Sequence, residues 1–356
     1  MEKVLNILLI FLIVLYKNIM YWPNMTNSIL YGLIMIIMLL TFLSLLNKKI
    51  NKNKFFVMTI ITIIMAIAVF HTGSANLFFP VLILFAFYNF DNAYQKLSKY
   101  YFFSLLICFC STILLNIIGI LPSYNITRYY NIRYSLGYIH PGFVFLYFLF
   151  LCLSGYYYFK NTKKFILFTI PFAIIFYCLS LSRTGIICYF IFIFLVYYYQ
   201  KRDVKKISNI VVYLFFILTA ITIVSVKLYE NYGLTQLDFL FSGRLFNYLY
   251  FIKNGLLTSP FGGINFGTTL YTIDNFFLVL FYDYGYVGYI IYGILSVIAI
   301  KKNINDKKFI ICIFVFLIYG ICDSNTIVSS INFLIPLQLM IIFNDKLIGR
   351  DDVEKN

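Results

Sequence analysis

The chain has 356 residues, of which 62% are hydrophobic and only 12% are charged, and its formal net charge is +15. Soluble globular domains carry about 25% charged residues, so this composition excludes a water-soluble fold and predicts an integral membrane protein. The basic residues alternate with the apolar segments, which makes the positive charge a signal of membrane topology and not of nucleic-acid binding.

Twelve apolar segments approach the length of about 20 helical residues that crosses a bilayer. The first is predicted to be a retained helix, because no small-residue cleavage site follows it. The expected fold is all-α, a single polytopic membrane domain over 1–356 with about 12 transmembrane helices and one long extracytoplasmic loop at 227–274. The twelve segments lie at 4–22, 28–46, 55–70, 73–90, 100–121, 143–159, 165–181, 185–200, 208–226, 276–300, 309–323 and 327–343.

The distribution of lysine and arginine assigns an orientation to these segments. With the N-terminus inside, every predicted inner loop is basic and both termini are cytoplasmic. Four of the six arginines nevertheless fall on the predicted outer side. A guanidinium binds multi-oxygen anions through a rigid fork of donors, so this bias predicts phosphate binding there; pairing with outer acids or lipid head groups is the alternative. The seven outer cations are Lys17, Arg128, Arg133, Arg183, Lys227, Arg244 and Lys253.

The first long outer loop, 122–142, combines arginines with tyrosines. Arg128 and Arg133 are interleaved with several tyrosines, and Tyr138 and His140 follow before the next apolar segment. This pattern favours stacking on sugars together with anion binding, although an interfacial aromatic belt has the same composition. His140 is a candidate hydrogen-bonding group or general base.

Arg183 stands in the sequence SLSRTG, between two strongly apolar segments. Small and hydroxylic residues surround it, and Ser182 or Thr184 is placed to cap the helix that follows. An anion at this turn would meet both the guanidinium and the amides of the helix N-terminus. The alternative interpretation is an arginine that snorkels to the membrane surface.

The second long loop, 227–274, contains a predicted amphipathic helix at 244–257, which would lie on the membrane or cover a cavity. Tightly turning sequence follows it, with Pro260 and a run of glycines in TSPFGGINFG. The apolar face of the predicted helix consists of Leu245, Leu249, Ile252 and Leu256.

Two acidic residues lie in this region, one just before the tenth segment and one within it. Asp274 and Asn275 open it and are placed either for chemistry or simply as its N-cap. Asp283 would lie about 13 Å deeper along a straight helix, where an acid predicts function. That depth holds unless Tyr284 and Gly285 break the helix.

Motifs for nucleotides and metals are missing from the sequence. It has no P-loop, no GxGxxG after a strand and no G-x-S-x-G elbow. Its seven cysteines lie in or at the ends of apolar segments, without CxxC or Cys/His spacing. We therefore expect no cofactor, no metal ligands and a metal-independent activity.

The order of several features resembles the Wzy-type O-antigen and capsular polysaccharide polymerases, which are related to the O-antigen ligases. These features are the many spans, the SLSRTG turn, the SGR of Ser242–Arg244 followed by PFGGINFG, and DNFFLVLFYDYGYVG from Asp274 onward. The resemblance covers mainly 137–300. It implies a GT-C-like membrane glycosyltransferase that moves glycan from undecaprenyl pyrophosphate to another lipid-linked repeat unit, on the outer face of the bacterial cytoplasmic membrane.

The resemblance also implies roles for individual residues. Family arginines engage the pyrophosphate, which corresponds to Arg183 and Arg244 here, with Arg128 or Arg133 assisting. The ligase branch has a histidine before the asparagine of an HN-like motif, where this sequence has Asp274; the difference favours a polymerase and makes Asp274 a candidate base. The full set of predicted site residues is Asp274, Arg183, Arg244 and His140 for catalysis, and Arg128, Arg133, Asn275, Tyr138 and Asp283 for substrate binding.

Two other functions remain open from the sequence. One is a ligase-like transferase that passes glycan from the lipid to a different acceptor. The other is a flippase for lipid-linked oligosaccharides, although transporters usually place polar groups near the membrane midplane and repeat their halves. The expected partners are lipid-linked glycan donor and acceptor, membrane lipid, and in the polymerase case a chain-length regulator and a flippase.

Overall fold

A computed structural model of the chain describes residues 2–23, 25–45, 52–72, 78–88, 90, 92–128, 131–233, 235–240, 243–262 and 272–343. These residues form two compact units that are each interleaved in sequence. The first unit comprises Met1–Asn51, Phe79–Gln200 and Ser329–Asn356, and the second comprises Lys52–Phe78 and Lys201–Val328. Neither unit is a continuous stretch, so each core forms from segments that are distant in sequence.

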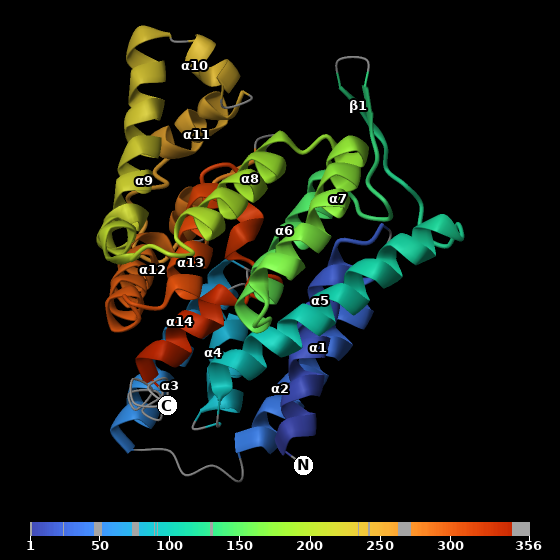
Figure 1. The fold of residues 1–356 in the computed structure, drawn as a ribbon. Helices are drawn as coiled ribbons and strands as arrows, with labels where there is room; N and C mark the ends of the chain where they lie inside the picture. Colours follow the sequence, from blue (N-terminus) through green and yellow to red (C-terminus); the bar gives the residue numbers. More distant parts are fainter. Residues whose placement is uncertain are drawn as a thin grey trace. The chain divides into compact units, whose positions relative to one another are not determined.

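The first unit is a helical bundle with one short hairpin (Figure 1). Within it, α5 packs against α6 and α1, α1 packs against α2, and α6 packs against α7 and α8. The core is strongly aromatic, because the rings of Phe109, Tyr138 and Tyr147 stack on one another. The elements are α1 (Glu2–Met20), α2 (Asn27–Leu45), α4 (Phe78–Phe87), α5 (Ala93–Ile117), β1 (Ile126–Arg128), β2 (Asn131–Arg133), α6 (Gly142–Tyr158), α7 (Thr162–Ser180), α8 (Arg183–Tyr198) and α14 (Leu334–Phe343).

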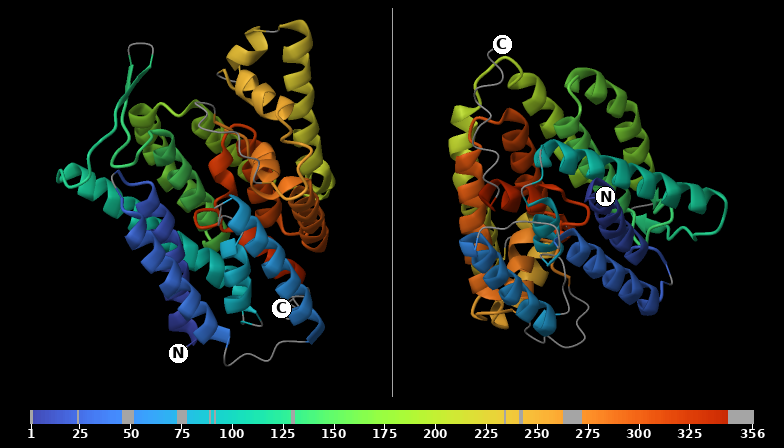
Figure 2. Two further views of the ribbon diagram at one scale, coloured as in Figure 1. Left: turned by 180° about the vertical axis from the view of Figure 1, so that it is seen from behind. Right: turned by 90° about the horizontal axis from the view of Figure 1, so that it is seen from below.

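The hairpin was not predicted by the all-α interpretation. Strands β1 and β2 pair antiparallel, with Ile126 opposite Arg133 and Arg128 opposite Asn131. Both Figure 1 and the rear view in Figure 2 show the hairpin extending beyond the end of α7. The alternation of polar and apolar residues over this short stretch suits a two-stranded ribbon, whereas the sequence analysis took the segment as an irregular loop.

The second unit is built around the long helix α9, which packs against α11, α12 and α13. At 28 residues, α9 is about 42 Å long, which exceeds the thickness of the bilayer hydrocarbon. It ends where Gly233 adopts a left-handed conformation, so the connection that follows begins later than 227. The elements are α3 (Lys52–Thr72), α9 (Lys205–Tyr232), α10 (Thr235–Leu240), α11 (Arg244–Lys253), α12 (Phe276–Lys302), α13 (Lys307–Gly320) and the 3₁₀ helix η1 (Ser324–Ile327).

Each of the twelve predicted apolar segments coincides with a helix. In the described part of the chain, six of these helices are long and apolar enough to cross a membrane, namely α1, α2, α5, α7, α9 and α12. The molecule is thus mostly helical with several candidate spans. Helices α4, α6, α8 and α14 are apolar but shorter, and the number of twelve spans and the GT-C-like arrangement stay predictions.

The predicted amphipathic helix is present as α11, and its buried face agrees with the predicted one in part. Leu245, Tyr248 and Phe251 are buried, at a spacing of three residues, while Leu249 and Ile252 are only partly covered. Figure 1 and the left view in Figure 2 place α11 beside α9, which it contacts. Leu245 and Leu256 of the predicted face are therefore buried as expected, while Tyr248 and Phe251 complete the buried face in place of Leu249 and Ile252.

Helix α12 is broken at Gly285, where φ is 65° and ψ is −172°. The chain at Ser259–Gly262 fits into this break: the Tyr286 and Val287 amides donate to the carbonyls of Ser259 and Pro260, at 3.0 and 3.2 Å. A Cβ atom on Gly285 would overlap the backbone of Pro260 and Gly262. Only glycine readily adopts this φ and leaves room for the loop, which explains the glycine at this position.

Candidate functional site

Asn275 fixes the start of α12 and joins three elements of the second unit. Its Oδ1 atom accepts from the Leu278 amide at 3.0 Å, as an N-cap does. Its Nδ2 atom donates to the Ile321 carbonyl at 2.9 Å and contacts the Thr222 hydroxyl at 3.3 Å. Asn275 is fully buried. Of the two interpretations of this residue, the structure supports the cap.

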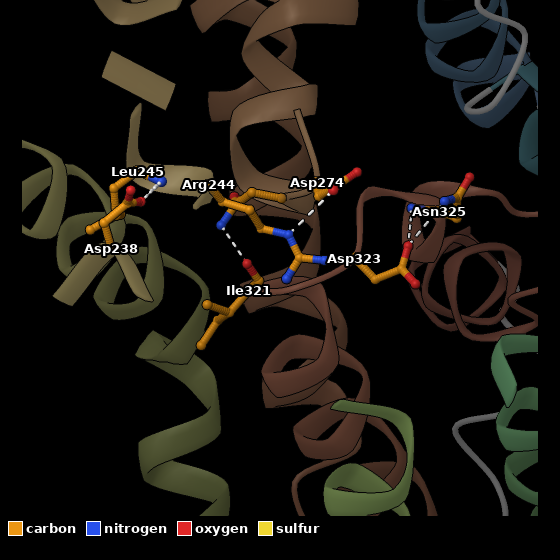
Figure 3. Close-up of polar contacts among 8 residues, drawn as sticks. Asp238, Arg244, Leu245, Asp274, Ile321, Asp323 and Asn325 are labelled. Carbon is orange, nitrogen blue, oxygen red and sulfur yellow. Dashed lines mark hydrogen bonds and ion pairs between the residues drawn. The ribbon is translucent and has the colours of Figure 1, made fainter. Parts of the chain in front are cut away.

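Because Asn275 takes the capping role, Asp274 is left to interact elsewhere. Its Oδ2 atom accepts from Arg244 Nε at 3.2 Å, across 30 residues of sequence. Figure 3 shows this contact between the first residue of α11 and the segment before α12. The structure therefore brings together two residues that the sequence singled out separately.

Helix α11 holds Arg244 in place through a carboxylate at its N-terminus. The Oδ1 atom of Asp238, in α10, accepts from the Leu245 amide at 2.9 Å (Figure 3). The Gly243 amide donates to the backbone carbonyl of Asp238 at 2.8 Å. These bonds satisfy amides that the helix itself leaves free and set the first turn of α11, from which Arg244 projects.

The guanidinium of Arg244 is partly buried, with its side chain 25% exposed. Burial opposes its charge, but the neighbouring Asp274 and other groups outweigh that effect and raise the pKa of Arg244 above its usual value. The side chain therefore remains a cation. Among the described residues, its two terminal nitrogens make no hydrogen bond, so they are available as donors.

Asp323 adds a second carboxylate to this region. It follows α13 and precedes η1, and its Oδ1 atom accepts from the Asn325 amide at 2.9 Å and from the Asn325 side chain at 3.0 Å (Figure 3). Burial raises the pKa of Asp323, while the bonds from Asn325 partly oppose that shift and the charge of Asp274 adds to it. The sequence analysis missed Asp323 because it closes an apolar segment and resembles a span end.

Tyr248 is the other residue that the sequence analysis missed. It lies one turn after Arg244 on α11 and is fully buried. Its hydroxyl has no hydrogen-bond partner among the described residues. Burial raises its pKa, the positive charge of Arg244 opposes the shift, and the negative charges of Asp274 and Asp323 reinforce it. Tyr248 therefore belongs to the same electrostatic cluster as the ion pair.

Asp283 lies two residues before the helix break at Gly285, so the first part of α12 is helical as far as this residue, and its depth in the membrane stays a prediction. It is buried, 5% exposed, and a Cβ atom on Gly262 would lie 2.8 Å from the Asp283 carbonyl oxygen. The loop at Ser259–Gly262 thus packs against the backbone at this residue. Residues 241–242 and 263–271, which include Ser242 and part of PFGGINFG, lie outside the described part of the chain.

In the first unit, the end of the hairpin is attached to the turn between α7 and α8. Arg133 Nε donates to the Ser180 carbonyl at 2.8 Å, and the Tyr134 amide donates to the Leu179 carbonyl at 2.8 Å. These carbonyls at the end of α7 lack partners within the helix. The attachment brings Arg133 to the turn that carries Arg183.

Arg183 is the first residue of α8 and is exposed. Within the described residues its side chain forms no ion pair or hydrogen bond. Ser182 occupies the N-cap position, but its side chain makes no capping bond, and the capping role predicted for Ser182 is thus not seen. The guanidinium and the first amides of α8 lie at the same turn, as the sequence analysis expected.

Of the remaining predicted residues of the first unit, Tyr138 and His140 have structural contacts. Tyr138 is fully buried, and its hydroxyl donates to Asn18 Oδ1 at 3.0 Å. His140 Nδ1 accepts from the Gly142 amide at 3.0 Å, which satisfies the start of α6. Arg128 ends β1, but its side chain lies outside the described part of the structure. The binding roles predicted for these three residues stay predictions.

Comparison of the chain with protein-family models, with curated proteins and with solved structures found no match. The class of protein is therefore assigned from the structure alone, which is mostly helical and has candidate membrane-spanning helices. In the second unit, Arg244, Tyr248, Asp274 and Asp323 gather at the ends of α11, α12 and α13. In the first, Arg133 and Arg183 meet at one turn.

Proposed function

We propose that the protein is a polysaccharide repeat-unit polymerase, a membrane glycosyltransferase of the Wzy type. The observation that carries the proposal is the contact between Arg244 and Asp274, at 3.2 Å. The sequence marked these residues independently, one as a cation of the long loop and one as a candidate base. Their meeting at the start of a candidate membrane span supports a common site there.

The chemistry required of such an enzyme matches these groups. The acceptor sugar hydroxyl loses its proton to the Asp274 carboxylate while its oxygen forms a bond to the anomeric carbon of the donor glycan. The bond from that carbon to the pyrophosphate oxygen breaks, and undecaprenyl pyrophosphate leaves with the electron pair. Arg244 orients the carboxylate, and a positioned general base contributes typically 10²- to 10⁴-fold to such a reaction.

The resemblance implies that arginines bind the leaving pyrophosphate, and Arg183 is the residue that it assigns to this role in the first unit. Arg183 is supported in this role because it is exposed and has no acidic partner in the described structure. Arg133 reaches the same turn through the Ser180 carbonyl. A guanidinium stabilises developing phosphate charge without a metal, so the proposed reaction is metal-independent.

The proposed site faces the outer side of the bacterial cytoplasmic membrane, with both termini in the cytoplasm. The lysine-rich connections support this orientation. Cysteine introduced at Thr258, an exposed residue after α11, should react with an impermeant maleimide in intact cells lacking the native cysteines. Cysteine at Asn305, between α12 and α13, should react only after the membrane is opened. The reverse pattern of labelling would invert the orientation and remove the proposal of an outer-face site.

Deletion of the gene in its host tests the proposed function in cells. We expect surface glycan limited to single repeat units, with the ladder of longer chains lost and then restored by the wild-type gene. A flippase gives a different result, because its loss leaves lipid-linked repeat units on the cytoplasmic leaflet. Accumulation on that leaflet, measured with a glycan-modifying enzyme that cannot cross the membrane, would therefore contradict the proposal.

A further inference from the structure

The cluster around Arg244 offers both donors and acceptors to a ligand. In the described structure, the terminal nitrogens of Arg244 and the hydroxyl of Tyr248 are donors without protein partners. Asp274 contacts Arg244 through its Oδ2 atom, which leaves Oδ1 as an acceptor. A phosphate group bound here would meet a carboxylate, and two anions repel each other.

The charge balance also argues against an anion at this cluster. Asp274 neutralises Arg244, and Asp323 lies close enough to act electrostatically on both Asp274 and Tyr248. A sugar hydroxyl suits this environment better, because it is both a donor and an acceptor and carries no charge. It can donate to the Asp274 carboxylate while it accepts from a guanidinium or a phenol.

Tyr248 supplies a further hydrogen-bonding group at this cluster. Its hydroxyl is fully buried, lacks a partner and lies among charged groups. A buried polar group that is left unpaired is costly, and phenylalanine would fill the same space without that cost. Among the described residues, Tyr100 and Tyr147 also have buried hydroxyls without a partner, but that of Tyr248 lies one turn from Arg244 on α11. Burial keeps it protonated, so it can act only as a neutral hydrogen-bonding group.

We propose that Arg244, Tyr248 and Asp274 form the binding subsite for the acceptor sugar hydroxyl, with Tyr248 donating a hydrogen bond to the oxygen that Asp274 deprotonates. This inference rests on the proposed polymerase function and makes it more specific. It assigns Arg244 to the acceptor sugar, whereas the family resemblance implied a pyrophosphate contact for that residue. It also makes Tyr248 a substrate-binding residue.

The test uses the purified full chain in lipid nanodiscs with lipid-linked repeat units extracted from the deletion strain. Tyr248→Phe should slow chain extension by about tenfold, which corresponds to the loss of one hydrogen bond. Inhibition by added undecaprenyl pyrophosphate, which carries no sugar, should stay as in the wild type. The thermal unfolding temperature should be unchanged or higher, because the variant removes an unpaired buried hydroxyl.

Tyr250→Phe is the matched control, because it makes the same change on α11 at a residue outside the cluster, and it should extend chains at the wild-type rate. Two results would overturn the subsite: Tyr248→Phe that extends chains normally, or Tyr248→Phe that weakens undecaprenyl pyrophosphate inhibition as much as it slows extension. An inactive wild-type protein would instead overturn the proposed function, and the subsite with it. The two failures are therefore distinguishable.

Discussion

Replacing Asp274 with asparagine should slow chain extension by roughly 10²- to 10⁴-fold, the range that a general base contributes. Asparagine keeps the size and much of the shape of the side chain but cannot accept the proton of the acceptor hydroxyl. It also removes the negative charge that faces Arg244 at 3.2 Å. The measurement is the initial rate of polymer formation from lipid-linked repeat units by purified protein, normalised to the amount of folded protein in the membrane.

Glu230→Gln is the control for this substitution. Glu230 pairs with Lys253 at 2.8 Å, with both side chains substantially exposed, so the change also removes one carboxylate from an ion pair. Exposed pairs contribute little to stability, in the range of about 0–1 kcal/mol, and we expect nearly normal polymerisation. If Asp274→Asn retained a rate within a few-fold of Glu230→Gln, Asp274 would not be the base.

Arg183→Ala should leave the protein nearly inactive, and Arg183→Lys should remain strongly impaired. Lysine keeps the positive charge but loses the planar fork that binds two phosphate oxygens at once. A charge-assisted hydrogen bond is worth about 1.5–3 kcal/mol, so losing one or two slows turnover by roughly ten- to several-hundred-fold at 1.4 kcal/mol per decade. Rates should be measured together with the inhibition constant of undecaprenyl pyrophosphate, which should rise in both variants.

Lys227→Ala is the comparison for Arg183, because Lys227 is also an exposed cation, in the last turns of α9. Lys227→Ala should polymerise at nearly the wild-type rate. Both Arg183 variants should accumulate in the membrane like the wild type, since an exposed arginine contributes little to folding. Normal polymerisation by Arg183→Lys would show that charge alone suffices, and loss of the protein from the membrane in Arg183→Ala would show a structural role instead.

The positions of the helices could be predicted from the sequence because apolar length is a strong local signal. Each apolar segment coincides with a helix, and α11 begins at Arg244 as expected. Other features depend on tertiary packing. The buried face of α11 is set by contact with α9, and the break in α12 depends on the loop at Ser259–Gly262, which a periodicity argument does not include.

The candidate site was predictable residue by residue but not as a set of contacts. Asp274 and Asn275 were both open to a capping role, and only the structure shows that Asn275 takes it and leaves Asp274 to pair with Arg244. Tyr248 was hidden because tyrosine is frequent in this chain, and its single signal is a buried hydroxyl without a partner. The sequence offered one signal for Asp323, a carboxylate at the last residue of a strongly apolar segment.

Reconstitution of chain growth tests the proposed function most directly. Purified wild-type protein in liposomes would receive lipid-linked single repeat units from the deletion strain, in a buffer containing EDTA, and products would be sized by mass spectrometry. The proposal predicts chains of several repeat units on one lipid, with one undecaprenyl pyrophosphate released for each bond formed. Two results would contradict a metal-independent polymerase. In one, the repeat units stay single while they move between the two leaflets; in the other, extension starts only when magnesium is restored.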